Sequence, residues 1–164
     1  MKTHEEYMEL ALEEARKAEE IDEVPVGCVI VCGVEVISRG HNLKEQLNQA
    51  YAHAEMMAIQ KAAEVKRNWC LNDCDLYVTL EPCMMCTGII NLSRIRTVYY
   101  GTTDPKSGCL ETVIDLKKIN RLNHYPNIVG NILQKECSEI LTNYFRKKRE
   151  IIKEKKQKNK ANIQ

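Results

Sequence analysis

Hydrophobic side chains recur at two different spacings in the first 42 residues. In residues 5–20, apolar side chains such as Met8 and Leu12 return at helical intervals, so this stretch predicts an amphipathic helix. Two β-rich runs follow, EVPVGCVIV and VEVISRGHN, separated by a short turn around Gly33. This pattern predicts a β-hairpin whose strands are antiparallel, because so short a turn cannot form a crossover.

The rest of the chain alternates between helical and strand-like patterns. In chain order, the predicted elements are a helix in AHAEMMAIQKAAEVKR, a strand in CDLYVTL, a helix in CMMCTGIINLSR, a strand in IRTVYYGT, a short helix in VIDLKKIN, a weak strand in HYPNIVGNIL and a long helix from about Lys135. Such alternation favours helices packed around a sheet. We therefore predict a three-layer α/β/α fold with a mixed five-stranded sheet, the first two strands antiparallel and the last two parallel.

Domain organisation follows from the same pattern. The sequence shows no internal repeat, no low-complexity linker and no second domain. Residues 1–150 are therefore expected to form a single domain, and residues 151–164 a basic extension of the last helix that frays.

Composition places the chain among ordinary globular proteins. Hydrophobic residues make up 44% of its 164 residues and charged residues 29%. The N-terminal segment is polar and acidic, without the apolar core of a signal peptide. The longest apolar runs are far shorter than the roughly 20 residues that span a bilayer. We expect a cytoplasmic protein without membrane association.

A reducing compartment changes the interpretation of the eight cysteines. There, cysteines are core residues, metal ligands or nucleophiles rather than a disulfide framework. Cys28, Cys32 and Cys137 lie in strand-like or helical patterns and are interpreted as small apolar core residues. The sequence leaves three others undecided, Cys70, Cys74 and Cys109.

The segment LEPCMMC places Cys83 and Cys86 three residues apart, directly after Pro82. Proline is favoured at the first position of a helix, so we expect a helix to begin at Pro82 with both sulfurs on one face of its first turn. The positive end of a helix stabilises thiolate over thiol. Alone, this spacing is compatible with either a zinc-binding pair or a redox pair.

A second group of polar residues lies upstream, where YAHAEMM puts His53 and Glu55 at the start of the preceding helix. The intervening strand lets both helix N-termini meet at one edge of the sheet. A lone histidine is more often a core or capping residue. With Glu55 two residues later and PCxxC downstream, however, His53 is better interpreted as a zinc ligand. Structural zinc normally has four protein ligands, whereas catalytic zinc leaves one position to water. With Glu55 as the acid/base, the three ligands predict a catalytic zinc that lowers the pKa of its water to about 7.

These residues are similar to the H-x-E…P-C-x-x-C motif of the zinc-dependent nucleoside and nucleobase deaminases. More widely, EVPVG at 23–27, HN at 41–42, LYVTLEPC at 76–83, SRI at 93–95, DPKSG at 104–108 and YFRKKR at 144–149 resemble the bacterial tRNA adenosine deaminases. The resemblance covers roughly residues 5–150. It implies a cytidine-deaminase-like fold, one Zn²⁺ per chain and a homodimer.

The resemblance also implies an activity, the hydrolytic deamination of adenosine to inosine at the wobble position of a tRNA anticodon stem-loop, with an arginine tRNA as the substrate. A zinc-bound hydroxide would attack carbon 6 of adenine while Glu55 shuttles protons. By the same resemblance, Asn42 would bind the purine edge, Val26 would line the pocket, and the Ala54 backbone would contact the base. The implied flanking contacts are Asp104, Lys106 and Ser107 in a loop, and Tyr144, Phe145, Arg146, Lys148 and Arg149 in the final helix.

The C-terminal charge agrees with an anionic partner. The last 19 residues hold nine Lys and Arg and two Glu, a net charge of +7, whereas the first 145 carry −6. Basic and aromatic side chains together suit the splayed bases and phosphates of an RNA loop. Alternatively, Phe145 belongs to the core and the lysines are merely solvated.

Two rival functions remain at this point. A small-molecule deaminase, acting on guanine, cytosine or a free nucleoside, would share the metal site but need no basic, aromatic helix. A structural zinc module that binds RNA without turnover is disfavoured by Glu55 and by the missing fourth ligand.

Overall fold

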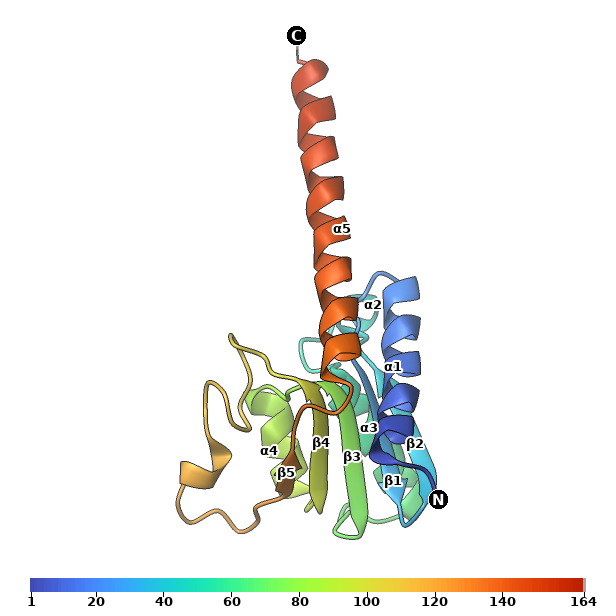
Figure 1. Cartoon of the computed structure of the whole chain (residues 1–164), viewed down its shortest axis with the longest axis vertical. Coiled ribbons are helices and arrows are strands. Elements are labelled where there is room, and N and C mark those ends of the chain that lie inside the picture. Colours follow the sequence, from blue (N-terminus) through green and yellow to red (C-terminus); the bar gives the residue numbers. More distant parts are fainter. Residues whose placement is uncertain (164) are drawn as a thin grey trace.

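The computed structural model describes residues 1–163, built around one five-stranded sheet with the order β2-β1-β3-β4-β5 (Figure 1). The strands are β1 (Gly27–Cys32), β2 (Glu35–His41), β3 (Cys74–Leu80), β4 (Thr97–Thr102) and β5 (Asn127–Val129). β1 pairs antiparallel with both β2 and β3, while β4 is parallel to β3 and to β5. This confirms the predicted mixed sheet.

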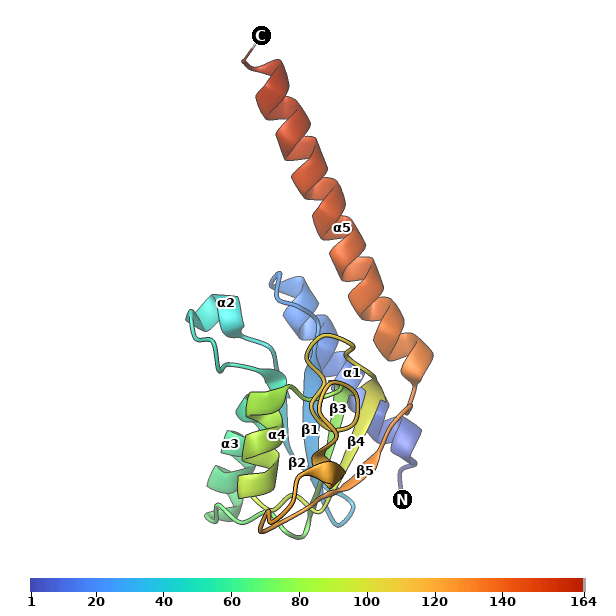
Figure 2. The same ribbon diagram turned by 90° about the vertical axis from the view of Figure 1, so that its left-hand side faces the viewer.

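Two helices cover each face of the sheet, which confirms the three-layer prediction (Figure 2). The helices are α1 (His4–Glu20), α2 (Lys44–Leu47), α3 (Ala54–Lys66), α4 (Met84–Leu92) and α5 (Gln134–Ala161), with a 3-10 turn at Leu116–Lys118. α3 and α4 pack on one face, and α1 and the start of α5 on the other. None of the helices within residues 1–163 combines the length and apolar character that crossing a membrane requires.

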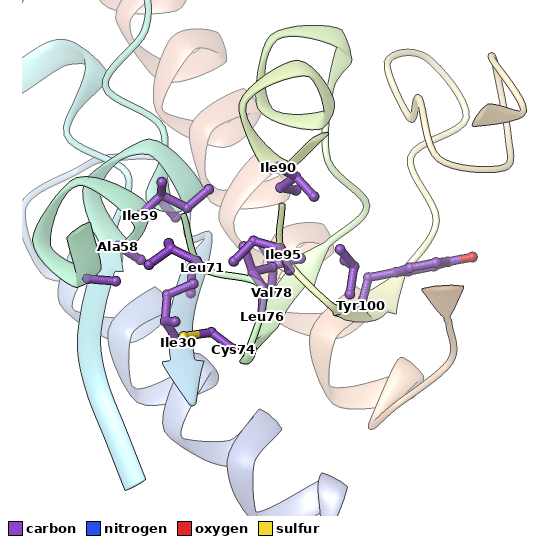
Figure 3. Packing of buried hydrophobic residues seen from close by; sticks show 14 of the residues in the cluster. Ile30, Ala58, Ile59, Leu71, Cys74, Leu76, Val78, Ile90, Ile95 and Tyr100 are labelled. Carbon is purple, nitrogen blue, oxygen red and sulfur yellow. The ribbon is translucent and has the colours of Figure 1, made fainter. Parts of the chain in front are cut away.

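The alternation of side chains along the central strands explains this layering. Successive residues of a strand point to opposite faces. Ile30, Leu76 and Val78 therefore contribute to the core beneath α3 and α4 (Figure 3), whereas Val29 and Tyr77 pack against α1. All five side chains are buried, so both faces of the central strands are apolar.

A close backbone approach positions the first turn of α3. A Cβ atom on Gly40 of β2 would lie 2.5 Å from the carbonyl oxygen of Ala54. Position 40 therefore requires glycine, because β2 passes very close to the backbone of α3 there. This close approach holds the first turn of α3, which contains Glu55, against the sheet.

The antiparallel pairing of β1 with β3 gives these central strands two distinct ends. Gly27 of β1 and Leu80 of β3 lie at one end, which we call the cavity end. Cys32 of β1 lies directly opposite Cys74 of β3 at the other, which we call the cysteine end. The N-termini of α3 and α4 approach the cavity end.

Local structure differs from the sequence expectations in a few places. Helix α4 begins at Met84 with Cys83 as its N-cap, so the prediction that Pro82 occupies the first helical position was wrong. The helix expected in residues 113–120 is only a 3-10 turn, and α2 was not anticipated.

Helix α5 changes character along its length. Its first half contacts the sheet through Cys137, whereas every residue from 149 to 163 is exposed. This second half projects away from the body of the protein (Figures 1 and 2). Fraying was expected over residues 151–164, but residues 151–161 continue as helix, and residue 164 lies outside the described residues.

Candidate active site

Both sequence motifs reach the cavity end through helix N-termini. His53 is the N-cap residue of α3 and Cys83 the N-cap residue of α4, each with an extended backbone. Cys86 lies in the first turn of α4 and is buried. Because β3 runs between the two helices, the three side chains converge from segments about 30 residues apart, as the sequence predicted.

The distances between these side chains suit a tetrahedral metal ion. His53 Nδ1 lies 3.6 Å from the Sγ atom of Cys83 and 3.6 Å from that of Cys86, and all three donor atoms lie within 4.8 Å of one another. Tetrahedral zinc, with Zn–S of about 2.3 Å and Zn–N of about 2.05 Å, places N and S about 3.6 Å apart. The donor set and its spacing therefore fit Zn²⁺.

Electrostatics in the cluster favour a thiolate. A hydrogen bond from the Cys86 thiol, followed by one from His53, lowers the pKa of Cys83 to about 4. Contact with Cys83 raises the pKa of His53 in return. Cys86 has a raised pKa, because its thiol donates to Cys83 and is buried. Thiolates are the form in which cysteine binds metals, so the cluster is prepared for a cation.

Glu55 lies in the first turn of α3 and is only 4% exposed. Burial raises its pKa to about 7. Glu55 lines a cavity of about 230 Å³ together with His53 and Cys83. A buried carboxylate that lines a cavity beside three potential metal ligands has the placement of a proton-transfer group.

The same cavity is also lined by three other segments of the chain, residues 24–26, 42–44 and 104–107. Of the residues suggested by resemblance, those that line it are Val26, Asn42, Ala54, Asp104 and Ser107. The Asn42 side chain is held in place, since Nδ2 donates to the Val24 carbonyl (3.2 Å) and Oδ1 accepts from the Lys44 amide (3.1 Å). An amide side chain offers two donors and two acceptor sites, so Asn42 retains capacity for a further partner.

Sequence reasoning missed Glu81, which lies between β3 and Cys83 and is 2% exposed. Its Oε2 accepts the amides of Leu110, Glu111 and Thr112 at 3.1–3.2 Å, and its Oε1 accepts the Thr112 hydroxyl. There is no room for a side chain on Gly108, whose Cβ would lie 2.5 Å from the Glu81 carboxyl carbon. One buried carboxylate thus fixes the 104–112 segment against the cavity. The available signal was that a buried carboxylate must find hydrogen-bond partners.

A wider groove of about 670 Å³ adjoins the cavity. The two share Val24, Leu80, Asp104 and Ser107 in their linings. The groove continues over residues from the 104–107 loop and α5, namely Pro105, Lys106, Phe145 and Arg149. Phe145 is 44% exposed, which contradicts the alternative that it belongs to the core.

Tyr144 and Lys148 occupy a different position from Phe145. Tyr144 is buried, and its hydroxyl donates to the carbonyl oxygen and to Oδ1 of Asp22 at 3.2 and 3.1 Å. Lys148 forms an ion pair with the same aspartate. These two residues attach α5 to the segment after α1, and Arg146 is exposed on the same helix.

Comparison with known proteins agrees with the fold and with this cluster. Residues 1–102 match the family described as the cytidine and deoxycytidylate deaminase zinc-binding region, and the chain belongs to this family of deaminases. Among curated relatives, a tRNA-specific adenosine deaminase of Bacillus subtilis (strain 168) is 46% identical over 143 residues, which is 87% of this chain and 89% of the relative.

Two solved structures are also similar. One, from work on A-to-I editing by tRNA:A34 deaminases at the wobble position of transfer RNA, has a TM-score of 0.80 and 44% identity, over 83% of this chain and 99% of the other. The second, a guanine deaminase from Bacillus subtilis, has a TM-score of 0.60 and 36% identity, over 62% and 66% of the two chains.

Proposed function

We propose that this protein is a tRNA adenosine deaminase, which converts adenosine at the wobble position of the anticodon to inosine. The observation that carries the proposal is the continuity of the cavity beside Glu55 with the groove formed by the 104–107 loop and α5. The curated relatives named tRNA-specific adenosine deaminase, at 44–46% identity over most of the chain, support it.

The groove favours a polymeric substrate over a free base. The cavity alone, at about 230 Å³, can receive a base. A free base requires nothing further, whereas the neighbouring nucleotides of an RNA loop need stacking and charged partners. Phe145, Lys106 and Arg149 offer these along the groove. Stacking of one base on an aromatic side chain contributes about 1–3 kcal/mol.

The reaction consumes water and releases ammonia from carbon 6 of adenine. His53, Cys83 and Cys86 would hold the zinc ion, which would supply an activated water at neutral pH. Glu55 accepts a proton in the cavity, delivers it to ring nitrogen 1 and then assists the departure of the amino group. Since oxygen replaces nitrogen at carbon 6, the product base is hypoxanthine and the nucleoside is inosine.

Orientation of the base is assigned to residues that already line the cavity. Asn42 binds the purine edge, Val26 forms a wall, and the backbone of Ala54 contacts the base. The first amides of a helix have no partner within that helix, so α3 offers N–H groups at this point. Asp104 and Ser107 face the target nucleotide, and Lys106 the neighbouring one.

The basic face of α5 is assigned to the phosphate backbone. Arg149 lines the groove, and Arg146 is exposed on the same helix. Tyr144 and Lys148 contribute by holding α5 in position through Asp22. By the same family relationship we propose one Zn²⁺ per chain, a homodimer, an arginine tRNA as the substrate and a cytoplasmic location.

The test is a deamination assay with zinc-loaded protein and several substrates in parallel. An anticodon stem-loop with adenosine at the wobble position is compared with free adenosine, guanine and cytosine, and products are identified by nucleoside analysis. A stem-loop with guanosine at that position is the matched control. Inosine from the adenosine stem-loop alone supports the proposal. Deamination of a free base beside an untouched stem-loop would establish the small-molecule alternative, for which the guanine deaminase structure is a precedent.

A further inference from the structure

A second group of reactive side chains lies at the cysteine end of the central strands, away from the cavity. Cys32 ends β1, Cys74 begins β3, and the two residues are direct partners in the antiparallel register. Asp73 precedes Cys74, and Lys66 is the last residue of α3. Nothing in the proposed deaminase chemistry uses these four residues.

The contacts within this group are close. Cys32 Sγ donates to Asp73 Oδ2 at 3.3 Å, and Cys74 Sγ donates to Asp73 Oδ1 at 3.4 Å. The two sulfurs and the carboxylate lie within 4.8 Å of one another. Lys66 Nζ contacts both carboxylate oxygens at 2.5 Å and lies 3.6 Å from Cys32 Sγ. The ammonium thus already supplies a positive charge to the Asp73 carboxylate and lies beside the Cys32 sulfur.

The pairing of the two cysteines suits a covalent link better than a metal. Directly opposed residues of antiparallel strands have Cα atoms about 4.5–5.5 Å apart. A disulfide spans Cα separations of about 4.4–6.8 Å. Cys28, on the same strand, lies opposite Val78 and has no such partner in the register of residues 27–32 with β3.

We propose that Cys32 and Cys74 form a dithiol that is reversibly oxidised to a cross-strand disulfide by exchange with a small-molecule disulfide. In the first step, Cys32 Sγ attacks one sulfur of oxidised glutathione, forms a mixed disulfide and releases one glutathione thiolate. In the second, Cys74 Sγ attacks the Cys32 sulfur and displaces the other glutathione. Two protein thiols are oxidised, one glutathione disulfide is reduced, and the two thiol protons end on glutathione.

The surroundings of the two sulfurs determine which of them reacts first with the soluble disulfide. Cys32 is half-buried, whereas Cys74 is fully buried, so a soluble disulfide reaches Cys32. The Lys66 ammonium lies 3.6 Å from the Cys32 sulfur, where its positive charge attracts the anionic glutathione disulfide. Burial raises the pKa of the Cys74 thiol to about 12, so the second, intramolecular step relies on the position of Cys74 directly opposite Cys32 rather than on a ready thiolate.

The location predicts what the crosslink changes. It joins the ends of β1 and β3 that lie away from Gly27 and Leu80, so the cavity keeps its lining. The oxidised protein should therefore retain deaminase activity, while its melting temperature rises because a crosslink restricts the unfolded chain.

The experiment treats the full-length, zinc-loaded protein with oxidised glutathione and counts thiols after denaturation. Wild type should lose two of its eight thiols and yield a crosslink between the tryptic peptides of residues 18–39 and 68–94. Cys32→Ser and Cys74→Ser should form no crosslink. Cys70→Ser is the matched control, because Cys70 lies in the same tryptic peptide, and it should form the crosslink as wild type does. Lys66→Met should slow crosslinking, whereas Lys61→Met on the same helix should not.

Three results would overturn the proposal. One is that wild type still shows all eight free thiols after treatment under conditions that oxidise a reference dithiol. Another is a crosslink that persists in Cys32→Ser or Cys74→Ser. The third is a second zinc ion per chain that disappears in these two variants, which would make the group a metal site.

Discussion

The two ends of β1 and β3 each hold three potential metal ligands within 4.8 Å of one another, yet their surroundings differ. At the cavity end, His53 Nδ1 lies 3.6 Å from two sulfurs, beside a cavity lined by a buried carboxylate. At the cysteine end, the Lys66 ammonium already contacts both the Cys32 sulfur and the Asp73 carboxylate. Proximity of suitable side chains therefore does not decide their chemistry. Their chemistry depends on whether a cavity gives a substrate access, on the presence of helix N-termini, and on whether another charged side chain already occupies the site.

The largest effect is expected from removing a ligand at the cavity end. Cys86→Ala should abolish zinc binding and activity and lower stability, because binding energy at such a site is also folding energy. Metal content by elemental analysis and deamination on the same sample provide the measurement. Cys32→Ala is the matched variant at the cysteine end and should keep both zinc and activity. Equal zinc loss in the two variants would erase the distinction between the ends.

A smaller effect is expected from the buried carboxylate that fixes the 104–112 segment. Glu81→Gln retains the shape but replaces one acceptor oxygen with a donor group that faces backbone amides. Hydrogen bonds to charged groups contribute about 1.5–3 kcal/mol, so we expect a loss of this size in urea unfolding together with a raised KM. An unchanged KM would show that the segment does not position substrate.

Phe145 allows the groove to be tested separately from the chemistry. Phe145→Ala should weaken stem-loop binding by about 1–3 kcal/mol, roughly 5- to 150-fold, without changing zinc content. Tyr144→Phe is the control, since it retains the ring but loses the hydrogen bonds to Asp22. Binding measured by fluorescence anisotropy should fall mainly in the first variant. A similar loss in both would assign the effect to the position of α5.

The projecting half of α5 should act through charge. Truncation after Arg149 removes five lysines and two glutamates, all from exposed helix. Affinity for RNA should become less dependent on salt, because fewer counterions are released on binding. The slope of log affinity against log salt concentration is the measurement. An identical slope would leave the extension without a part in RNA binding.

The smallest effect is expected at the cysteine end. A hydrogen bond from Lys66 lowers the pKa of Asp73 to about 2. A lowered pKa stabilises the fold above the ordinary value of 3.8, and that contribution is lost as pH falls toward 2. Asp73→Asn should therefore cost under about 1 kcal/mol at neutral pH, since Asp73 is exposed, and the difference should shrink in acid. If the difference in stability between wild type and Asp73→Asn stays constant from neutral pH down to about pH 2, the Lys66–Asp73 ion pair is not its source.

Much of this molecule could be predicted from local patterns. The alternation of helices and strands anticipated every strand, and the H-x-E and P-C-x-x-C spacings anticipated the cluster at the cavity end. What escaped prediction depends on long-range contacts. Glu81 meets partners about 30 residues away, and Tyr144 bonds to Asp22 across 122 positions. The opposition of Cys32 to Cys74 depends on β1 lying beside β3, an order that hydrophobic periodicity does not encode.

The most direct test of the account separates metal binding from proton transfer in one variant. Glu55→Ala removes the buried carboxylate but leaves the three potential zinc ligands, His53, Cys83 and Cys86, in place. Zinc content and inosine formation from the stem-loop are measured on the same preparation. The account predicts about one zinc per chain and a loss of turnover of about 10²- to 10⁴-fold, the usual contribution of a general acid–base group. Loss of zinc in this variant would make Glu55 a ligand, and undiminished inosine formation would contradict its assignment as the proton carrier.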